Sequence, residues 1–242
     1  MSAAANSGAT PLLASRGVKK SFAIGDRNLG VLHGIDLELA RGELVGLVGA
    51  SGAGKSTLLH ILGLLDPPTE GQVLLDGDDA WRLPAGERAR LRNERLGFVF
   101  QFYHLLPELD ALENVVLPAM IGRALRGRLS LREIRARATE TLVRFGMGER
   151  LTHRPSQLSG GEQQRVAIAR AMILDPAVVI ADEPTGNLDS ATGEKVLDLL
   201  IHEQKQRGLA LLLVTHDERV ARRCDRMLVM QDGRIRGDPR AP

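Results

Sequence analysis

The sequence is poor in cysteine, in aromatic residues and in long hydrophobic runs. Its 242 residues include a single cysteine, Cys224, so no disulfide can form within the chain and a reducing compartment is expected. Only 3% of the residues are aromatic, which argues against stacking platforms for single-stranded nucleic acid. No apolar run approaches the ~20 residues that a membrane-spanning helix needs, so any membrane contact is expected to go through a partner.

The charge balance and the first residues exclude further classes of protein. A formal net charge of +2 is too small to indicate a nucleic-acid-binding protein, even with a sequence pI near 9.0. The first residues, MSAAANSGATPLLAS, have neither a basic start nor a long apolar stretch, so a signal peptide is not expected. Residues 1–11 are small and polar, which predicts a disordered tail. We expect a soluble, cytoplasmic chain.

Apolar runs that alternate with helical patterns predict an α/β core with a helical insertion. Residues 43–49, 177–183 and 209–216 form nearly continuous apolar runs, as expected of parallel strands buried on both faces. A helical pattern separates the last two runs, which predicts a strand–helix–strand unit with a right-handed crossover. Two earlier strands are expected near the N-terminus. Residues from about 102 to 172 are mostly helix and loop, and this part is predicted to be the insertion.

Two local signals sharpen this outline. Ser130 and Glu133 have the spacing of a capping box, and Gly146 follows the same helical pattern, so a helix is predicted between them. Near the C-terminus, Asp232 and Gly233 separate two short apolar runs, which predicts a tight hairpin.

The segment GASGAGKST matches the phosphate-binding pattern G-x-x-x-x-G-K-[ST]. Its glycines let the backbone wrap a phosphate, Lys55 can reach the β- and γ-phosphates of ATP, and Ser56 can bind Mg²⁺. The alternative is a glycine-rich turn with a chance lysine, but a predicted strand before the segment and a helix after it argue against that. The loop comprises Gly49, Ala50, Ser51, Gly52, Ala53, Gly54, Lys55, Ser56 and Thr57.

Polar side chains stand where three other predicted strands end. Asp182 and Glu183 follow a buried run, and ligands of doubly wound sheets bind at the carboxyl ends of strands. Asp182 is a candidate for the Mg²⁺ shell, and Glu183 for positioning or deprotonating water. His216 could contact a γ-phosphate or the attacking water, and Gln101 could contact Mg²⁺ or water. The alternative is that these are ordinary polar residues at exposed strand ends. The presence of a phosphate-binding loop in the same chain argues against that alternative.

The segment LSGGEQ, residues 158–163, allows two interpretations. In the first, Ser159 and Glu162 form a capping box and nothing binds there. However, Gly160 and Gly161 each weaken a helix by roughly 1 kcal/mol relative to alanine, and close approach to a ligand would offset this. In the second interpretation the segment is therefore an anion site without its own lysine. A second copy of the chain, packed head to tail, could supply that lysine.

Taken together, these motifs resemble those of the nucleotide-binding subunit of an ABC transporter. GASGAGKST resembles the Walker A motif, LSGGEQ the signature motif, VVIADE the Walker B motif and GNLD the D-loop. Gln101 resembles the Q-loop glutamine and His216 the switch histidine. The resemblance implies a P-loop NTPase fold of the ABC type, with an antiparallel β subdomain and a helical insertion. It covers residues 12–242, with the helical subdomain at about 102–172.

The resemblance also implies how such subunits work. Two subunits form a homodimer on binding ATP, and residues 158–163 of each face the phosphate-binding loop of the other. Glu183 would be the catalytic base, His216 the sensor of the γ-phosphate, and Asp189 a contact at the shared site. An integral-membrane permease converts this cycle into work. No nucleic acid is involved.

Longer stretches narrow the resemblance within the family. Residues 100–122, 153–171 and 181–189 are similar to LolD-type subunits, which extract lipoproteins from the bacterial inner membrane. This implies LolC- or LolE-like permeases and a peripheral place on the cytoplasmic side of that membrane. MacB-type exporters and FtsE-type cell-division ATPases share the same ATPase motifs, so both remain alternatives. A non-transport ABC ATPase is less attractive, because the segment between Lys55 and Ser159 shows no sustained heptads.

Two further features invite interpretation. The family usually stacks adenine on a tyrosine after the first strand, and Phe22 is the best candidate here, since it keeps the ring without the hydroxyl.

An arginine-rich stretch within residues 123–137 is expected to be a solvated face, with contact to acidic permease loops or lipid headgroups as the alternative. Its arginines are Arg123, Arg126, Arg128, Arg132, Arg135 and Arg137.

Overall fold

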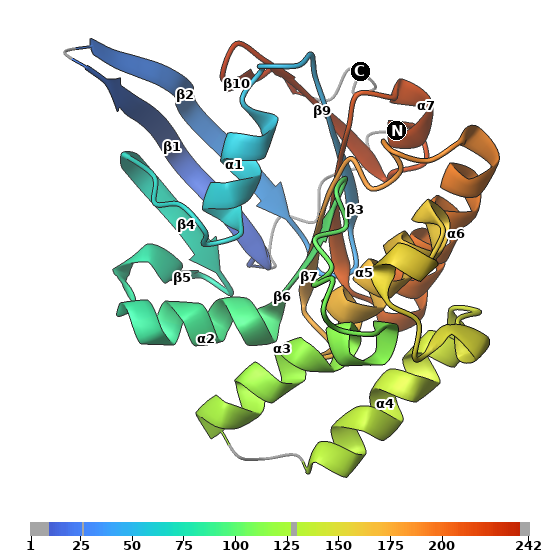
Figure 1. Cartoon of the computed structure of the whole chain (residues 1–242). Helices are drawn as coiled ribbons and strands as arrows, with labels where there is room; N and C mark the ends of the chain where they lie inside the picture. Colours follow the sequence, from blue (N-terminus) through green and yellow to red (C-terminus); the bar gives the residue numbers. More distant parts are fainter. Residues whose placement is uncertain (1–9, 26, 127–129, 238–242) are drawn as a thin grey trace.

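Two β-sheets with helices around them form the architecture seen in a computed structural model of the chain (Figure 1). The structure describes residues 10–25, 27–126 and 130–237. Most of the predicted N-terminal tail and Arg128 therefore lie outside the described residues. Within the described part, no helix is both long and apolar enough to span a bilayer.

The larger sheet carries the parallel strands that the apolar runs predicted. Neighbouring strands are parallel except for the last pair, β9 and β10, which form a hairpin. Asp232 and Gly233 turn this hairpin with φ angles of 47° and 68°, as the sequence predicted. In spatial order the strands are β10 (Arg234–Ile235), β9 (Arg226–Gln231), β3 (Leu44–Val48), β8 (Ala210–Thr215), β7 (Val178–Asp182) and β6 (Leu96–Phe100).

The smaller sheet is antiparallel and is built largely from the N-terminal part of the chain. The two early strands are present, and they pair with each other along most of their length. In spatial order the strands are β2 (Arg27–Leu39), β1 (Leu13–Ile24), β4 (Glu70–Leu75) and β5 (Asp78–Asp79). At the upper left of Figure 1 this sheet stands apart from α3 and α4, which lie at the bottom.

The helices connect and cover these sheets. The predicted helix after Ser130 forms with both halves of its capping box in place, as the sequence indicated. The α-helices are α1 (Lys55–Leu62), α2 (Ala85–Arg95), α3 (Ala111–Arg126), α4 (Leu131–Arg144), α5 (Gly160–Met172), α6 (Ser190–Arg207) and α7 (Glu218–Ala221). Short 3-10 turns lie at Ala80–Arg82, Gly148–Arg150 and Pro155–Gln157.

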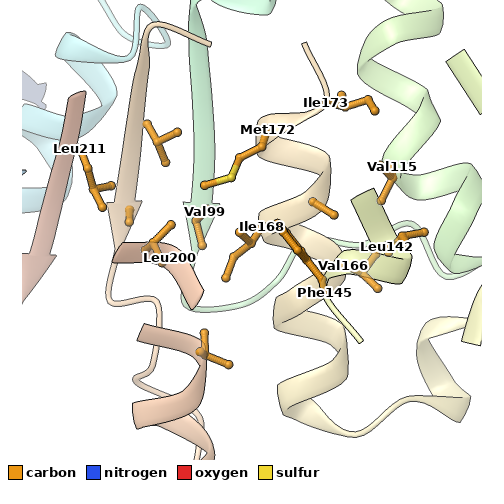
Figure 2. Close-up of a cluster of buried hydrophobic side chains, with 14 of the residues drawn as sticks. Val99, Val115, Leu142, Phe145, Val166, Ile168, Met172, Ile173, Leu200 and Leu211 are labelled. Atoms are coloured by element: carbon orange, nitrogen blue, oxygen red, sulfur yellow. The ribbon is translucent and has the colours of Figure 1, made fainter. Parts of the chain in front are cut away.

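Strand residues of the larger sheet alternate between two hydrophobic clusters, one on each face. On β8, Leu211 and Leu213 join one cluster, whereas Leu212 and Val214 join the other. Figure 2 shows part of the first cluster, in which α5 packs between the sheet and the helices α3 and α4. The second cluster joins this face of the larger sheet to buried residues of α1 and of the smaller sheet. Burial on both faces explains why these strands are almost entirely apolar until their carboxyl ends.

Candidate active site

The predicted strand-end residues meet in one cavity at the carboxyl edge of the larger sheet. Its volume is about 600 Å³, within the range of small-molecule sites. The phosphate-binding loop, the start of α1, and the ends of β6, β7 and β8 all contribute to it. The lining residues are Val31, Ser51, Gly52, Gly54, Lys55, Ser56, Thr57, Gln101, Asp182, Glu183 and His216.

The phosphate-binding loop wraps the start of α1. Gly54, the N-cap residue, has a φ of 100° and no side chain that could bind the first N–H groups of the helix. The Lys55 ammonium lies back across the loop, and donates to the carbonyl oxygens of Gly49 at 2.7 Å and Ala50 at 3.0 Å. A Cβ atom at Gly49 would lie 2.2 Å from the Met230 carbonyl oxygen, so only glycine fits there. The loop thus offers free backbone donors and one cation, as an anion site requires.

A hydroxyl and a carboxylate lie together beside this loop. Ser56 donates from Oγ to Asp182 Oδ2 at 3.1 Å. Burial raises the pKa of Asp182, the charge of Glu183 raises it further, and the hydrogen bond from Ser56 works against both. The described residues contain no group of three or more His, Cys, Asp or Glu that could hold a metal ion. This donor set suits Mg²⁺, which takes one or two protein ligands and fills its shell with phosphate and water oxygens.

Glu183 and His216 form a pair at the mouth of the cavity. His216 Nδ1 lies 2.9 Å from Glu183 Oε1, and the Glu183 side chain is 16% exposed against 72% for His216. Glu183 adopts a φ of 46°, an unfavourable conformation for a residue other than glycine. Its backbone N–H donates to the Val214 carbonyl at 2.9 Å. Such local strain is typical of functional positions, where the surrounding structure over-determines it.

Gln101 reaches the cavity from the end of β6 and is held by Asn187, a contact that no sequence motif pointed to. Its Nε2 donates to Asn187 Oδ1 at 3.0 Å, and Asn187 Nδ2 donates back to the Gln101 carbonyl at 3.0 Å. A Cβ at Gly186 would lie 3.0 Å from Gln101 Nε2. Asn187 lies inside the GNLD segment, but nothing in its spacing pointed to Gln101. Val31, another unpredicted lining residue, comes from β2 in the smaller sheet.

The segment LSGGEQ lies elsewhere and begins α5. Ser159 accepts from the backbone N–H of Glu162 at 3.4 Å, and Glu162 accepts from the Ser159 N–H at 2.8 Å, so the predicted capping box forms. These hydrogen bonds lower the pKa of Glu162, and Arg150 contributes from 3.2 Å. Ser159, Gly160, Gly161 and Glu162 do not line the cavity around Lys55.

The two glycines of this segment have packing reasons within the chain. A Cβ at Gly161 would lie 2.4 Å from Thr192 Cγ2 on α6, and one at Gly160 would lie 2.9 Å from the Tyr103 hydroxyl. Their effect on helix stability is therefore offset by close packing, and the glycines alone do not require a ligand. Asp189 accepts from the Thr192 N–H at 3.0 Å as the N-cap of α6, and these bonds lower the pKa of Asp189.

Phe22 lies on β1 and does not line the cavity. The residue is 40% exposed, and Lys20 Nζ lies 5.0 Å from its ring centroid. Four other loop or cap positions, namely Gly49, Ala50, Ala53 and Asp189, are also absent from the cavity lining.

The arginine-rich stretch is described only in part. Arg132 and Arg135 are exposed on α4, as a solvated face predicts, and Arg137 pairs with Asp175. The side chains of Arg123, Arg126 and Arg128 lie outside those that the structure describes.

Comparison with known proteins gives one consistent answer. Residues 32–186 match the family described as ABC transporter. The chain is 51% identical to the lipoprotein-releasing system ATP-binding protein LolD of Shewanella denitrificans, over 93% of this chain and 94% of the relative. It is 50% identical to LolD of Acinetobacter baylyi, over 92% of this chain and 96% of the relative.

Solved structures agree with these relatives. A bacterial ABC transporter cassette solved as a dimer superimposes with a TM-score of 0.86 at 42% identity, over 95% of this chain and 100% of the cassette. The same cassette in a dimeric post-hydrolysis state, bound to ADP and Pi, also gives a TM-score of 0.86. The predicted fold class is confirmed, and so is the prediction of an ATP-hydrolysing enzyme. The chain belongs to the ABC transporter family, as an ATP-binding and ATP-hydrolysing subunit.

Proposed function

We propose that this chain supplies the ATPase activity of a transporter that releases lipoproteins from the bacterial inner membrane. The observation that carries this proposal is the high identity to LolD-type subunits along nearly the whole chain. MacB-like efflux and FtsE-like cell division use the same site residues, but no observation favours either. The nucleotide-binding domain spans residues 12–242, and the helical subdomain lies at about 102–172.

The phosphate-binding loop holds the triphosphate of ATP. The loop backbone and the open N-terminus of α1 bind the β- and γ-phosphates. Lys55 now donates to two loop carbonyls, and on nucleotide binding its ammonium turns to the phosphate oxygens. Thr57 lines the same cavity. Phe22 lies on β1 outside that lining and stacks on the adenine beyond the phosphate-binding loop.

Mg²⁺ would be held by Ser56, Asp182 and Gln101 together with the phosphates. The fit rests on the Ser56 hydroxyl next to the partly buried Asp182 carboxylate, because Mg²⁺ takes oxygen ligands of this kind. When bound, Mg²⁺ neutralises phosphate charge. The pairing of Gln101 with Asn187 keeps the glutamine at the edge of this shell.

Glu183 acts as the general base on the attacking water. Its carboxylate is largely buried, and the contact with His216 orients it from the cavity mouth. His216 also contacts the γ-phosphate, because it lines the same cavity as the phosphate-binding loop. The strained backbone of Glu183 fixes the carboxylate before the reaction begins, so less reorganisation is needed.

The site is completed by a second subunit. Residues 158–163 lie outside the cavity of their own chain, and a solved relative of the same fold is a dimer. Ser159, Gly160, Gly161 and Glu162 of one subunit therefore face the phosphate-binding loop of the other, with Asp189 at the junction. ATP binding closes the homodimer, and hydrolysis reopens it.

The permease partner is LolC- or LolE-like, and the chain sits peripherally on the cytoplasmic face of the inner membrane. The test is to isolate tagged chain from membranes of its native bacterium and identify the proteins and lipoproteins that copurify. We expect a four-span permease with a large periplasmic domain, together with bound lipoproteins. An efflux or cell-division permease in its place would refute lipoprotein release while leaving the ATPase assignment intact.

A further inference from the structure

Gln164 is a buried side chain on α5 that joins two strand ends of the active site. Its side chain is fully buried, and Nε2 donates to the Phe100 carbonyl at 3.3 Å and to the Pro184 carbonyl at 2.6 Å. Phe100 directly precedes Gln101, and Pro184 directly follows Glu183. One amide group of α5 therefore holds the backbone next to two site residues.

The chemistry of its partners fixes the orientation of this amide. Carbonyl oxygens only accept hydrogen bonds, so the nitrogen of Gln164 must face Phe100 and Pro184. Its oxygen, Oε1, then has no hydrogen-bond partner among the described residues. Burying an unpaired acceptor is unfavourable. The unpaired oxygen is therefore an energetic cost at this position, and the two hydrogen bonds that the amide donates to the Phe100 and Pro184 carbonyls offset it.

Arg170, six residues further along α5, holds the other end of the same segment. Its guanidinium donates to the Tyr103 carbonyl at 2.7 Å and to the His104 carbonyl at 2.5 Å. Gln101 lies between the two points of attachment. Tyr103 also approaches Gly160 at the first turn of α5, as the close contact of its hydroxyl indicates.

We infer that Gln164 and Arg170 are positioning residues that fasten Gln101 and Glu183 to the signature helix α5. This inference rests on the proposed roles of Gln101 and Glu183. Loss of either side chain is expected to disturb the orientation of Gln101 and Glu183 and to leave the phosphate-binding loop itself untouched.

Gln204 on α6 provides a matched comparison. It is also buried, at 3% exposure, and its Nε2 also bridges two backbone carbonyls, Gly42 at 2.8 Å and Leu209 at 3.1 Å. Those carbonyls precede β3 and β8, at the opposite edge of the sheet from the cavity. Loss of Gln204 therefore removes the same kind of stabilisation without touching the site.

The experiment compares Gln164→Met with Gln204→Met in the full chain. Methionine keeps the length of glutamine but cannot donate, so each variant loses two hydrogen bonds to backbone carbonyls. Both should lower Tm by similar amounts. Gln164→Met should lower kcat for ATP hydrolysis about tenfold or more with KM for ATP within about twofold, because orientation rather than binding is lost. Gln204→Met should keep both constants close to those of the unmodified chain.

Arg170→Lys tests the other attachment independently of whether Gln164→Met folds. Lysine keeps the charge but lacks the planar fork that donates to two carbonyls. It should show the same selective fall in kcat. Unchanged kcat in Arg170→Lys or in Gln164→Met, or an equal fall in Gln204→Met, would overturn the inference.

Glu183→Gln, measured alongside, separates this inference from the proposed function. If Glu183→Gln abolishes hydrolysis while Gln164→Met retains it, the catalytic assignment stands and only the positioning role fails. If Glu183→Gln hydrolyses ATP normally, the proposed role of Glu183 fails, and the inference built on it fails as well.

Discussion

The helices α1 and α5 both begin at glycine-rich segments, yet their first turns differ in chemistry. Gly54 caps α1 without any side-chain hydrogen bond, and Lys55 and Ser56 follow it inside a cavity. Ser159 caps α5 with a complete capping box, and no residue of that segment shares the cavity. The first turn of α1 is open to an anion, whereas the first turn of α5 already has an internal carboxylate partner, Glu162.

This difference shows that a glycine-rich helix start does not define a phosphate site by itself. At α1 the glycines serve the loop conformation and leave N–H groups free. At α5 the glycines also permit close packing against α6 and Tyr103. A role for α5 in ATP chemistry therefore depends on a second subunit, and the following variants test each helix start separately.

The largest effect is expected from removal of the cation at α1. Lys55→Ala should abolish detectable ATP binding and lower hydrolysis by about 10³-fold or more, because Lys55 is the loop's only cation at the phosphates. Binding of a fluorescent ATP analogue and release of phosphate would be measured. Lys195→Ala, which removes an exposed lysine of α6, is the control and should leave both unchanged. Normal ATP binding by Lys55→Ala would contradict the assignment of the loop.

Removal of the general base, Glu183, should leave ATP binding at α1 intact and let the ATP-bound dimer accumulate, which tests whether α5 serves a second subunit. Glu183→Gln keeps the shape of the side chain but cannot accept a proton, so hydrolysis should fall by roughly 10²- to 10⁴-fold while ATP still binds. Because ATP is not consumed, the closed dimer should accumulate and elute earlier in size-exclusion chromatography with MgATP. An ATP-bound variant that stays monomeric would argue against a site shared between subunits.

A charge placed at the start of α5 should act on hydrolysis but not on the binding of ATP at α1. Ser159→Arg removes the cap and sets a cation at the positive end of a helix, which is unfavourable. We expect unchanged ATP affinity and hydrolysis lowered about 10²-fold, as for loss of a group that stabilises developing charge. Ser130→Arg damages the equivalent cap of α4 and serves as the control. Equal activity of the two variants would leave α5 with a capping role alone.

The sequence predicted the α/β core well because its signals are local or strongly periodic. The strand runs form as expected, since each buried strand needs apolar residues on both faces. Lys55, Asp182 and Glu183 could be placed together because the carboxyl ends of parallel strands share one edge. The capping box of Ser130 and Glu133 was equally predictable, because its partners lie within one turn.

Contacts between distant segments could not be derived in the same way. Asn187 holds Gln101, and Gln164 bridges β6 and β7, but neither has a spacing pattern that reveals its partner. The packing of Gly161 against Thr192 depends on how α5 and α6 approach each other. For this reason the sequence suggested a ligand where the structure also offers a neighbouring side chain.

The smallest effect is expected from the carboxylate that caps α5. Hydrogen bonds from Ser159 hold the pKa of Glu162 below its ordinary value. Its stabilising effect is therefore present above the unfolded-state pKa and is lost as pH falls through the lower folded-state pKa. Glu162→Ala should lower Tm by a few degrees near neutral pH and reduce the dependence of Tm on acid. It should also slow hydrolysis a few-fold if α5 serves the partner's nucleotide. Glu133→Ala, which opens the corresponding box on α4, should lower Tm without slowing hydrolysis. An unchanged rate in both variants would confine Glu162 to stabilising its own helix.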